Sequence, residues 1–130
     1  MVEKIRKPDE EWRTALSDLA YRVTRKKATE RAFTHDDFPK GSAHFHCVCC
    51  DRPLFDAEAK FDSGTGWPSF YKPISADAVG ESEDRSWFMS RTEVHCAACE
   101  AHLGHVFPDG PEPTGLRYCI NGVALSHRPR

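Results

Sequence analysis

The sequence predicts a small, mainly β protein of antiparallel strands preceded by short helices. Three observations favour this fold class. Apolar residues at helical spacing are confined to residues 9–27. From residue 28 onward, short apolar stretches alternate with Gly, Pro, Asp and Ser, which is typical of strands joined by turns. Two Cys-x-x-Cys pairs lie in this second part, where one metal ion could join distant turns.

Residues 9–27 predict two short helices. The apolar residues at helical spacing are Trp12, Leu16, Leu19 (or Ala20) and Val23. Pro8-Asp9 is suited to opening the first helix, and Ser17-Asp18 can cap a second. Because the apolar face is narrow, two helices are favoured over one long helix.

The remainder of the chain predicts an antiparallel sheet or a small sandwich. Candidate strands cover residues 44–48, 54–55, 59–61, 86–94, 105–107, 116–121 and 123–126. Residues 75–79 suggest a single helical turn. The sequence has eight glycines and nine prolines, nearly all of them after residue 28. We therefore expect one domain over residues 1–130, with a helical segment at 1–27 and a metal-clasped β core at 28–126.

Length and charge exclude several classes of protein. The chain has 130 residues and a formal net charge of −2, so it lacks the basic field expected of a nucleic-acid-binding domain. No apolar run approaches the ~20 residues of a membrane span. The N-terminus lacks the apolar stretch of a secretory signal, so we expect a cytoplasmic protein, a monomer by default. In that setting, six cysteines favour metal binding or thiol chemistry over disulfides.

Four of the six cysteines have the spacing of a structural zinc site. They form two pairs, Cys47 with Cys50 and Cys96 with Cys99. Two Cys-x-x-Cys turns can place four thiolates tetrahedrally around Zn²⁺, which leaves no open position for catalysis. His95 is an alternative ligand beside Cys96. The residues that follow the two pairs are similar, which suggests two hairpin-like lobes around one ion.

A strand over residues 116–121 offers a candidate nucleophile. Because side chains alternate along a strand, Arg117, Cys119 and Asn121 share one face. A guanidinium near the thiol would stabilise its thiolate and lower its pKa. The residues alone leave two interpretations open, which are a reactive thiolate and an inert, half-buried thiol beside a surface arginine.

Two further segments are candidates for the same site. His102 and His105 flank Gly104, and imidazole is the usual proton shuttle near neutral pH. Structural histidines and metal ligands are the alternatives there. Trp67 follows two glycines and precedes Pro68, so it lies on a rigid turn where it could wall an apolar pocket or fill the core.

Three long motifs together resemble the methionine-R-sulfoxide reductase family, MsrB, in its zinc-containing form. They are residues 61–70 (FDSGTGWPSF), 101–110 (AHLGHVFPDG) and 117–121 (RYCIN), and the similarity covers about residues 14–126. The resemblance implies two small antiparallel sheets of the β-tent type with short N-terminal helices. It implies reduction of the R epimer of methionine sulfoxide in proteins or peptides.

The resemblance also implies roles for individual residues. Cys119 corresponds to the nucleophile, whose sulfenic acid is then reduced by thioredoxin or another external thiol. Arg117 would hold the thiolate. Trp67 would receive the S-methyl group, with Phe107 as a second wall. The residues implied to bind the sulfoxide oxygen are His102, His105 and Asn121. Those implied to bind zinc are Cys47, Cys50, Cys96 and Cys99.

The sequence departs from the family pattern in two places. Many members have a resolving cysteine where this chain has Thr65, so Cys119 cannot form that internal disulfide. Cys49 is the only sulfur without another assignment, and direct reduction of Cys119 by an external thiol is favoured over a Cys49 partner. Trp87-Phe88 replaces a His-Gly pair, which could alter substrate preference. The alternative from another functional class is a non-catalytic zinc module that binds a protein partner.

Overall fold

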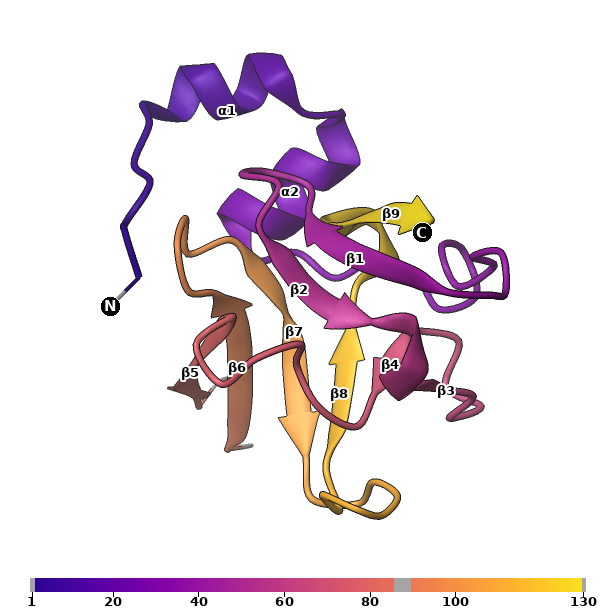
Figure 1. Cartoon of the computed structure of the whole chain (residues 1–130). Helices are drawn as coiled ribbons and strands as arrows, with labels where there is room; N and C mark the ends of the chain where they lie inside the picture. The colour runs from indigo at the N-terminus through magenta and orange to yellow at the C-terminus, as the bar shows by residue number, and fades with distance from the viewer. Residues whose placement is uncertain (1, 86–89, 130) are drawn as a thin grey trace.

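The computed structural model describes residues 2–85 and 90–129 of the chain. Two short helices are followed by strands in two sheets (Figure 1). The helices are α1 (Asp9–Ala15) and α2 (Asp18–Lys26). The strands are β1 (Ala43–Cys47), β2 (Pro53–Asp56), β3 (Lys60–Phe61), β4 (Ser69–Phe70), β5 (Val79–Asp84), β6 (Arg91–Cys96), β7 (His102–Phe107), β8 (Arg117–Ile120) and β9 (Leu125–Pro129). Short 3₁₀ turns at Ala57–Ala59 and Gly122–Ala124 precede β3 and β9.

Both sheets are antiparallel, which confirms the predicted fold class. The smaller sheet has the strand order β2-β1-β9, and the larger has the order β3-β4-β8-β7-β6-β5. In the larger sheet, β8 lies between β4 and β7, so both neighbours can bring side chains to its face. Residues 123 and 124, expected to begin a strand, belong instead to the 3₁₀ turn Gly122–Ala124, and the strand begins only at Leu125. Residues 75–79 contain a hydrogen-bonded turn instead of the expected helical one.

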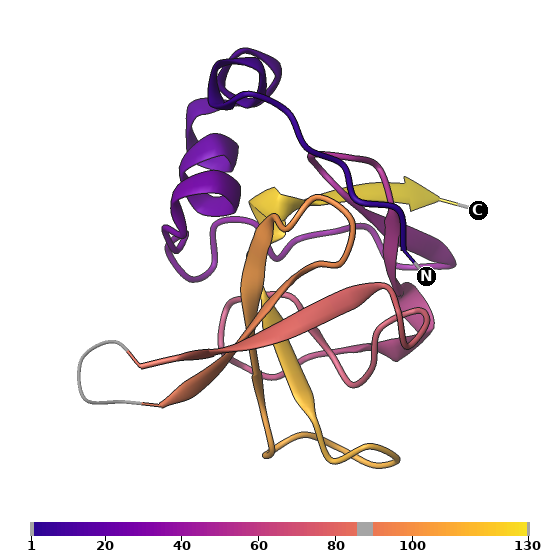
Figure 2. The same cartoon turned by 90° about the vertical axis from the view of Figure 1, so that its left-hand side faces the viewer.

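The two helices are confirmed close to their predicted bounds. The Ser17 hydroxyl accepts the backbone N–H of Ala20 at 3.1 Å, which satisfies a donor that a helix start otherwise leaves free. Pro8 precedes α1, where its missing N–H has no cost. The helices lie together at one end of the molecule (Figure 2), and α2 packs against β7 and the Gly122–Ala124 turn. None of the described helices is long and apolar enough to cross a bilayer.

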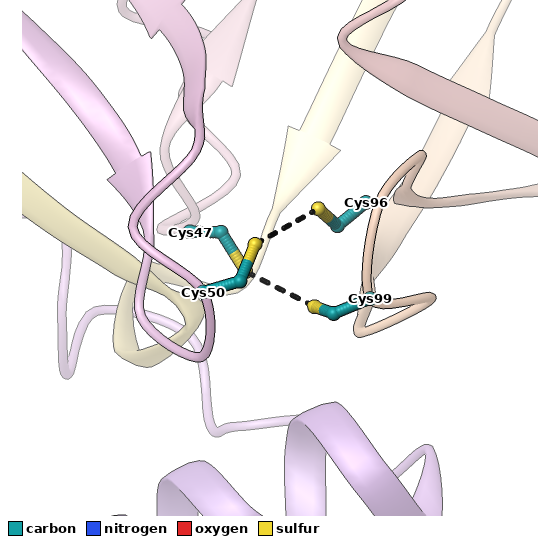
Figure 3. A group of neighbouring side chains, drawn as sticks. All are labelled: Cys47, Cys50, Cys96 and Cys99. Atoms are coloured by element: carbon teal, nitrogen blue, oxygen red, sulfur yellow. Dashed lines mark hydrogen bonds between the residues drawn. The ribbon is translucent and has the colours of Figure 1, made fainter. Parts of the chain in front are cut away.

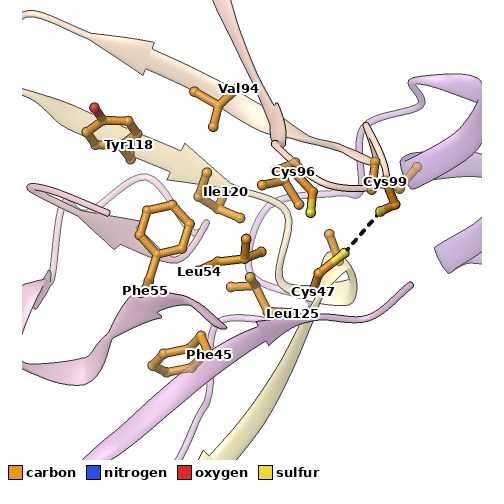
Figure 4. Packing of buried hydrophobic residues seen from close by; sticks show 14 of the residues in the cluster. Phe45, Cys47, Leu54, Phe55, Val94, Cys96, Cys99, Tyr118, Ile120 and Leu125 are labelled. Carbon is orange, nitrogen blue, oxygen red and sulfur yellow. Dashed lines mark hydrogen bonds between the residues drawn. The ribbon is translucent and has the colours of Figure 1, made fainter. Parts of the chain in front are cut away.

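The core lies between the sheets and is rich in aromatic rings. Phe45 and Phe55 come from the smaller sheet, and Phe70 comes from the larger one (Figure 4 shows Phe45 and Phe55). Phe55 stacks on Phe70 with ring centroids 4.4 Å apart, and Phe45 meets Phe70 edge-on at 5.3 Å. Tyr118 and Ile120, on the inner face of β8, are also buried here. Their burial turns the alternate residues of β8 away from the core.

The segment before α1 fastens the helices to the cysteine-rich region. Ile5 donates its N–H to the carbonyl of Ala98, and Lys4 Nζ donates to the carbonyl of Ala97. From α2, Arg25 donates to the carbonyl of Cys99 at 2.7 Å and lies 4.6 Å from the Trp12 ring centroid. The N-terminal helices therefore cover the turn that carries Cys96 and Cys99.

Candidate functional site

The four predicted metal ligands come together in space (Figure 3). Their sulfur atoms all lie within 4.8 Å of one another. Cys47 and Cys99 Sγ are 3.6 Å apart, as are those of Cys50 and Cys96. Four sulfurs at about 2.3 Å from one tetrahedral ion would be about 3.8 Å apart. The cluster therefore fits a single metal ion with four thiolate ligands, and His95 does not belong to it.

The two cysteine turns have the same backbone geometry, which explains the similar sequences after them. The first turn is residues 47–50 and the second is residues 96–99. After each, one residue adopts the left-handed region, Asp51 with φ 64° and Glu100 with φ 63°. Each of these residues donates its N–H back to the carbonyl of the first cysteine of its turn, at 2.8 and 2.9 Å. Two copies of one turn thus face each other across the sulfur cluster.

A separate cavity of about 320 Å³ surrounds Cys119 and is called the Cys119 cavity below. Its lining residues are Thr29, Thr65, Trp67, Arg91, Gly104, His105, Phe107, Arg117, Cys119 and Asn121. The lining includes six of the seven residues that the sequence assigned to catalysis or substrate binding; His102 is the one left out. Thr29 and Arg91 were not foreseen, and no local motif marks them.

Strand register brings the polar groups of this cavity together. In the β7–β8 pair, His105 lies opposite Cys119 and Phe107 lies opposite Arg117. Such directly opposed residues have Cβ atoms about 4.5–5.5 Å apart on the same face. The Arg117 guanidinium lies 4.4 Å from the Phe107 ring centroid. On the other side of β8, Ser69 of β4 is opposite Cys119. The nucleophile candidate is thus central in the sheet and half-buried.

Electrostatics at Cys119 differ from the sequence expectation in net direction. Burial raises the pKa of the Cys119 thiol, and this outweighs the Arg117 charge and the Thr65 hydroxyl, which lower it. Arg117 is also shared, because its Nε and Nη2 donate to the two carboxylate oxygens of Asp109 at 2.9 and 3.1 Å. The negative charges of Asp36 and Asp109 raise the pKa of Cys119 further. The free cavity therefore favours the thiol over the thiolate.

Trp67 is held at the cavity wall by a turn of unusual backbone. Gly64 and Gly66 have φ of 75° and 88°, in the region that only glycine adopts readily. The half-buried Trp67 ring donates Nε1–H to the carbonyl of Glu30 at 3.1 Å. A hydrogen bond between the hydroxyls of Ser63 and Ser69, 2.7 Å apart, joins the start of the turn to its end. The tryptophan is therefore fixed by its ring as well as by its backbone.

Glu30 organises two walls of the cavity, although sequence reasoning did not single it out. Its carboxylate is buried and accepts the backbone N–H groups of Gly122 and Val123, both at 2.9 Å. Its own N–H donates to Asn121 Oδ1 at 3.0 Å. Asn121 in turn donates Nδ2–H to the carbonyl of Leu103 at 2.9 Å. The only sequence signal was an acidic residue in a loop of mixed composition, and its partners lie about 90 residues away.

The structure separates the two histidines that the sequence left equivalent. His105 lines the cavity, and its Nε2 lies 3.0 Å from Asp84 Oδ2. His102 is buried behind it, with Nδ1 at 2.6 Å from Glu93 Oε2 and its ring 5.6 Å from that of His105. Burial lowers the pKa of His102. Of the two, His105 is thus the imidazole that lines the cavity, and His102 is buried behind it.

Cys49 and Thr65 lie in two different places, one at the metal cluster and the other in the cavity. Thr65 lines the cavity together with Cys119, and its hydroxyl lowers the pKa of the Cys119 thiol. Cys49 neighbours Cys47, Cys99 and Thr24 at the metal cluster. Among the described lining residues, Cys119 is the one cysteine. The Trp87-Phe88 substitution lies outside the described residues.

Comparison with known proteins gives one consistent result. Residues 16–129 match the family described as the SelR domain. A protein from Pseudomonas putida strain W619, named peptide methionine sulfoxide reductase MsrB, is 58% identical over 130 residues, covering 99% of this chain and 98% of its own. Proteins with the same name from Pseudomonas entomophila strain L48 and Pseudomonas fluorescens strain Pf-5 are also 58% identical, and each is covered over 99% or more of its length.

Proposed function

Because this chain belongs to the SelR-domain family of peptide methionine sulfoxide reductases, we propose that Cys119 is its nucleophile and methionine-R-sulfoxide its substrate. The chain is an oxidoreductase that acts on methionine sulfoxide. This membership argues against the non-catalytic zinc module considered from the sequence. The observation that supports Cys119 most directly is its place in a cavity with Trp67, His105 and Arg117.

In the proposed reaction, Cys119 Sγ attacks the sulfoxide sulfur as its thiolate. The S-methyl group lies against Trp67 and Phe107, which provide the apolar wall of the cavity. The sulfoxide oxygen passes to Cys119, so the substrate sulfur gains two electrons and leaves as methionine. Cys119 loses two electrons and becomes a sulfenic acid. The R preference would follow from the cavity having one apolar wall and one polar wall.

The proton for the sulfoxide oxygen is proposed to come from His105. This ring lies on the strand neighbouring Cys119, in direct register with it. The carboxylate of Asp84 at its Nε2 orients the ring. Asn121 closes the same wall, but its amide is engaged by Glu30 and Leu103. We therefore assign Asn121 to holding the wall, and His105 to proton transfer.

Regeneration of Cys119 is proposed to use an external thiol. Sulfenic acid and a first thiol give a mixed disulfide and water, and a second thiol then releases Cys119 as a thiol. Thioredoxin supplies both thiols in one molecule, whereas a small thiol would act twice. The placement of Thr65 in the cavity and of Cys49 at the metal cluster supports this route over an internal disulfide.

The four-cysteine cluster is proposed to hold one structural Zn²⁺. A closed set of four thiolates has no position for substrate, and the cluster is separate from the residues that line the Cys119 cavity. Bound zinc would join the β1–β2 turn to the β6–β7 turn. Since β7 carries His105, the metal would hold the catalytic sheet indirectly.

The test is reduction of dabsyl-methionine-R-sulfoxide and its S epimer, driven by dithiothreitol, by the wild type and Cys119→Ser. The proposal predicts turnover of the R epimer alone, and only by the wild type. Activity retained in Cys119→Ser would refute the assigned nucleophile, and equal turnover of both epimers would refute the stereochemistry. Cys49→Ser is the matched control, because it removes a thiol outside the cavity.

Regeneration is tested separately by peptide mapping after one turnover without reductant. We expect no disulfide between Cys49 and Cys119, and full thioredoxin-driven activity in Cys49→Ser. A Cys49–Cys119 disulfide in the wild type would overturn the external-thiol route.

A further inference from the structure

Phe33 exposes its aromatic ring to solvent beside the turn that carries Trp67. The residue is 75% exposed, and among the described residues no other large hydrophobic side chain is exposed. Phe38, in the same loop, is instead packed edge-on against Phe45 with ring centroids 5.0 Å apart. One exposed apolar side chain is ordinary by itself. Its backbone and its fixed position make Phe33 unusual.

The backbone of Phe33 adopts a conformation that bulky residues rarely adopt. Its φ is 66°, in the left-handed region that favours glycine or asparagine. Its N–H donates to the carbonyl of Gly66 at 2.7 Å. The ring lies directly over Gly66, where a Cβ would come within 2.6 Å of Phe33 Cδ2. A strained backbone that is held so firmly is typical of functional positions.

The contacts of Phe33 place its ring against the turn that forms the Trp67 wall of the Cys119 cavity, and the ring itself lines a separate hollow with Lys60 and Phe61. Gly66 immediately precedes Trp67, which forms a wall of the cavity. The Trp67 ring is bound to the carbonyl of Glu30, so two hydrogen bonds join residues 30–33 to residues 65–67. Thr29, from the same segment as Phe33, lines the cavity. The exposed ring therefore has a fixed position relative to the Trp67 wall of the cavity.

We propose that Phe33 is a docking contact for the polypeptide that flanks the oxidised methionine. The inference rests on the proposed function of the Cys119 cavity. A cavity of about 320 Å³ admits a single side chain, so the flanking residues of a substrate must run across its rim. An apolar flanking residue would pack on the Phe33 ring and remove both surfaces from water. Free methionine sulfoxide lacks such a neighbour and would not contact Phe33.

The test compares two substrates with dithiothreitol as the reductant. One is free methionine-R-sulfoxide, and the other is a blocked pentapeptide in which leucines flank methionine-R-sulfoxide. Phe33→Asn removes the ring and suits a positive φ, so we expect a melting temperature at or above that of the wild type. For the peptide, kcat/KM should fall about three- to tenfold, through KM, as expected for losing one partly buried ring. For the free amino acid it should not change.

Two further variants sharpen the comparison. Phe33→Leu keeps an apolar side chain and should retain most of the preference for the peptide. Glu58→Gln, at an exposed residue outside both the Cys119 cavity and the cysteine cluster, is the control and should leave both substrates unaffected.

Three outcomes would overturn the inference while leaving the reductase activity in place. They are an equal loss on both substrates in Phe33→Asn, no loss on either, and a loss seen only when thioredoxin replaces dithiothreitol. The last outcome would mean that the Phe33 ring contacts thioredoxin and not the substrate. A wild type inactive on both substrates would instead remove the proposed function, and this inference with it.

Discussion

Arg117 and Asp109 form a two-point ion pair beside the thiol of Cys119. Nε and Nη2 of Arg117 donate to the two oxygens of Asp109 at 2.9 and 3.1 Å. The guanidinium lowers the pKa of Cys119, and the carboxylate raises it. The pKa of Cys119 stays raised because the thiol is buried, and the carboxylates of Asp36 and Asp109 oppose the charge of Arg117.

Substituting Asp109 and substituting Arg117 should shift the pKa of Cys119 in opposite directions. Asp109→Asn removes a negative charge, so the pKa of Cys119 falls and alkylation by iodoacetamide becomes faster at neutral pH. Arg117→Ala removes the stabilising cation, so alkylation and turnover fall at neutral pH and recover at higher pH. The rate of alkylation of Cys119 against pH, followed by mass spectrometry, measures both shifts. Two profiles that coincide with the wild type would contradict the electrostatic role.

Glu30→Gln should destabilise the protein and weaken substrate binding. The amide places an NH₂ group where two backbone donors, Gly122 and Val123, now share a carboxylate. One buried donor would be left without a partner, which costs about 1–3 kcal/mol. We expect that loss in urea unfolding, together with a higher KM, because Trp67 is anchored on the same residue. Glu58→Gln, at an exposed residue, is the matched control. An unchanged stability of Glu30→Gln would refute the stabilising role of the Glu30 carboxylate.

Loss of the metal should unfold the protein. The apparent binding energy of a structural zinc site is about 10–16 kcal/mol, as large as the stability of a typical domain. Cys96→Ser should therefore bind no stoichiometric zinc and show no cooperative thermal transition. Cys49 lies next to Cys50 in the sequence but is not one of the four clustered cysteines, so Cys49→Ser should keep one zinc per chain. Metal analysis with circular dichroism tests this, and a folded, metal-free Cys96→Ser would disprove it.

His102 should make stability fall on mild acidification. Burial holds its pKa below the ordinary value of 6.5, so the folded state keeps the ring neutral. The unfolded chain takes up a proton as the pH falls through about 6.5, and the free energy of unfolding then decreases. His102→Gln lacks this protonation, so its free energy of unfolding should decrease less between pH 7 and pH 5. Identical slopes in urea unfolding series would show that His102 is not buried as a neutral ring.

Local patterns in the sequence predicted the four-cysteine cluster and the polar face of β8. Cys-x-x-Cys spacing fixes a turn, and strand alternation puts Arg117 and Cys119 on one side. Two strands were missed for local reasons. β4 has only two residues, too few to show a period, and β5 is acidic and lacks alternating apolar residues.

Partners that are distant in sequence could not be predicted. Glu30 binds the turn after Asn121 across about 90 residues, and no periodicity joins two such segments. The ranking of His105 over His102 depended on which side of β7 faces the cavity, and on Glu93 being buried beneath it. The pKa of Cys119 could not be inferred from a neighbouring arginine alone, because burial and Asp109 both act against it.

The most direct measurement is mass spectrometry of Cys119 after a single turnover with methionine-R-sulfoxide and no reductant. We expect one methionine formed per chain, and a sulfenic acid on Cys119 that a dimedone probe captures. The five other cysteines should remain unmodified. Methionine formed without any change at Cys119 would contradict its assignment as the nucleophile.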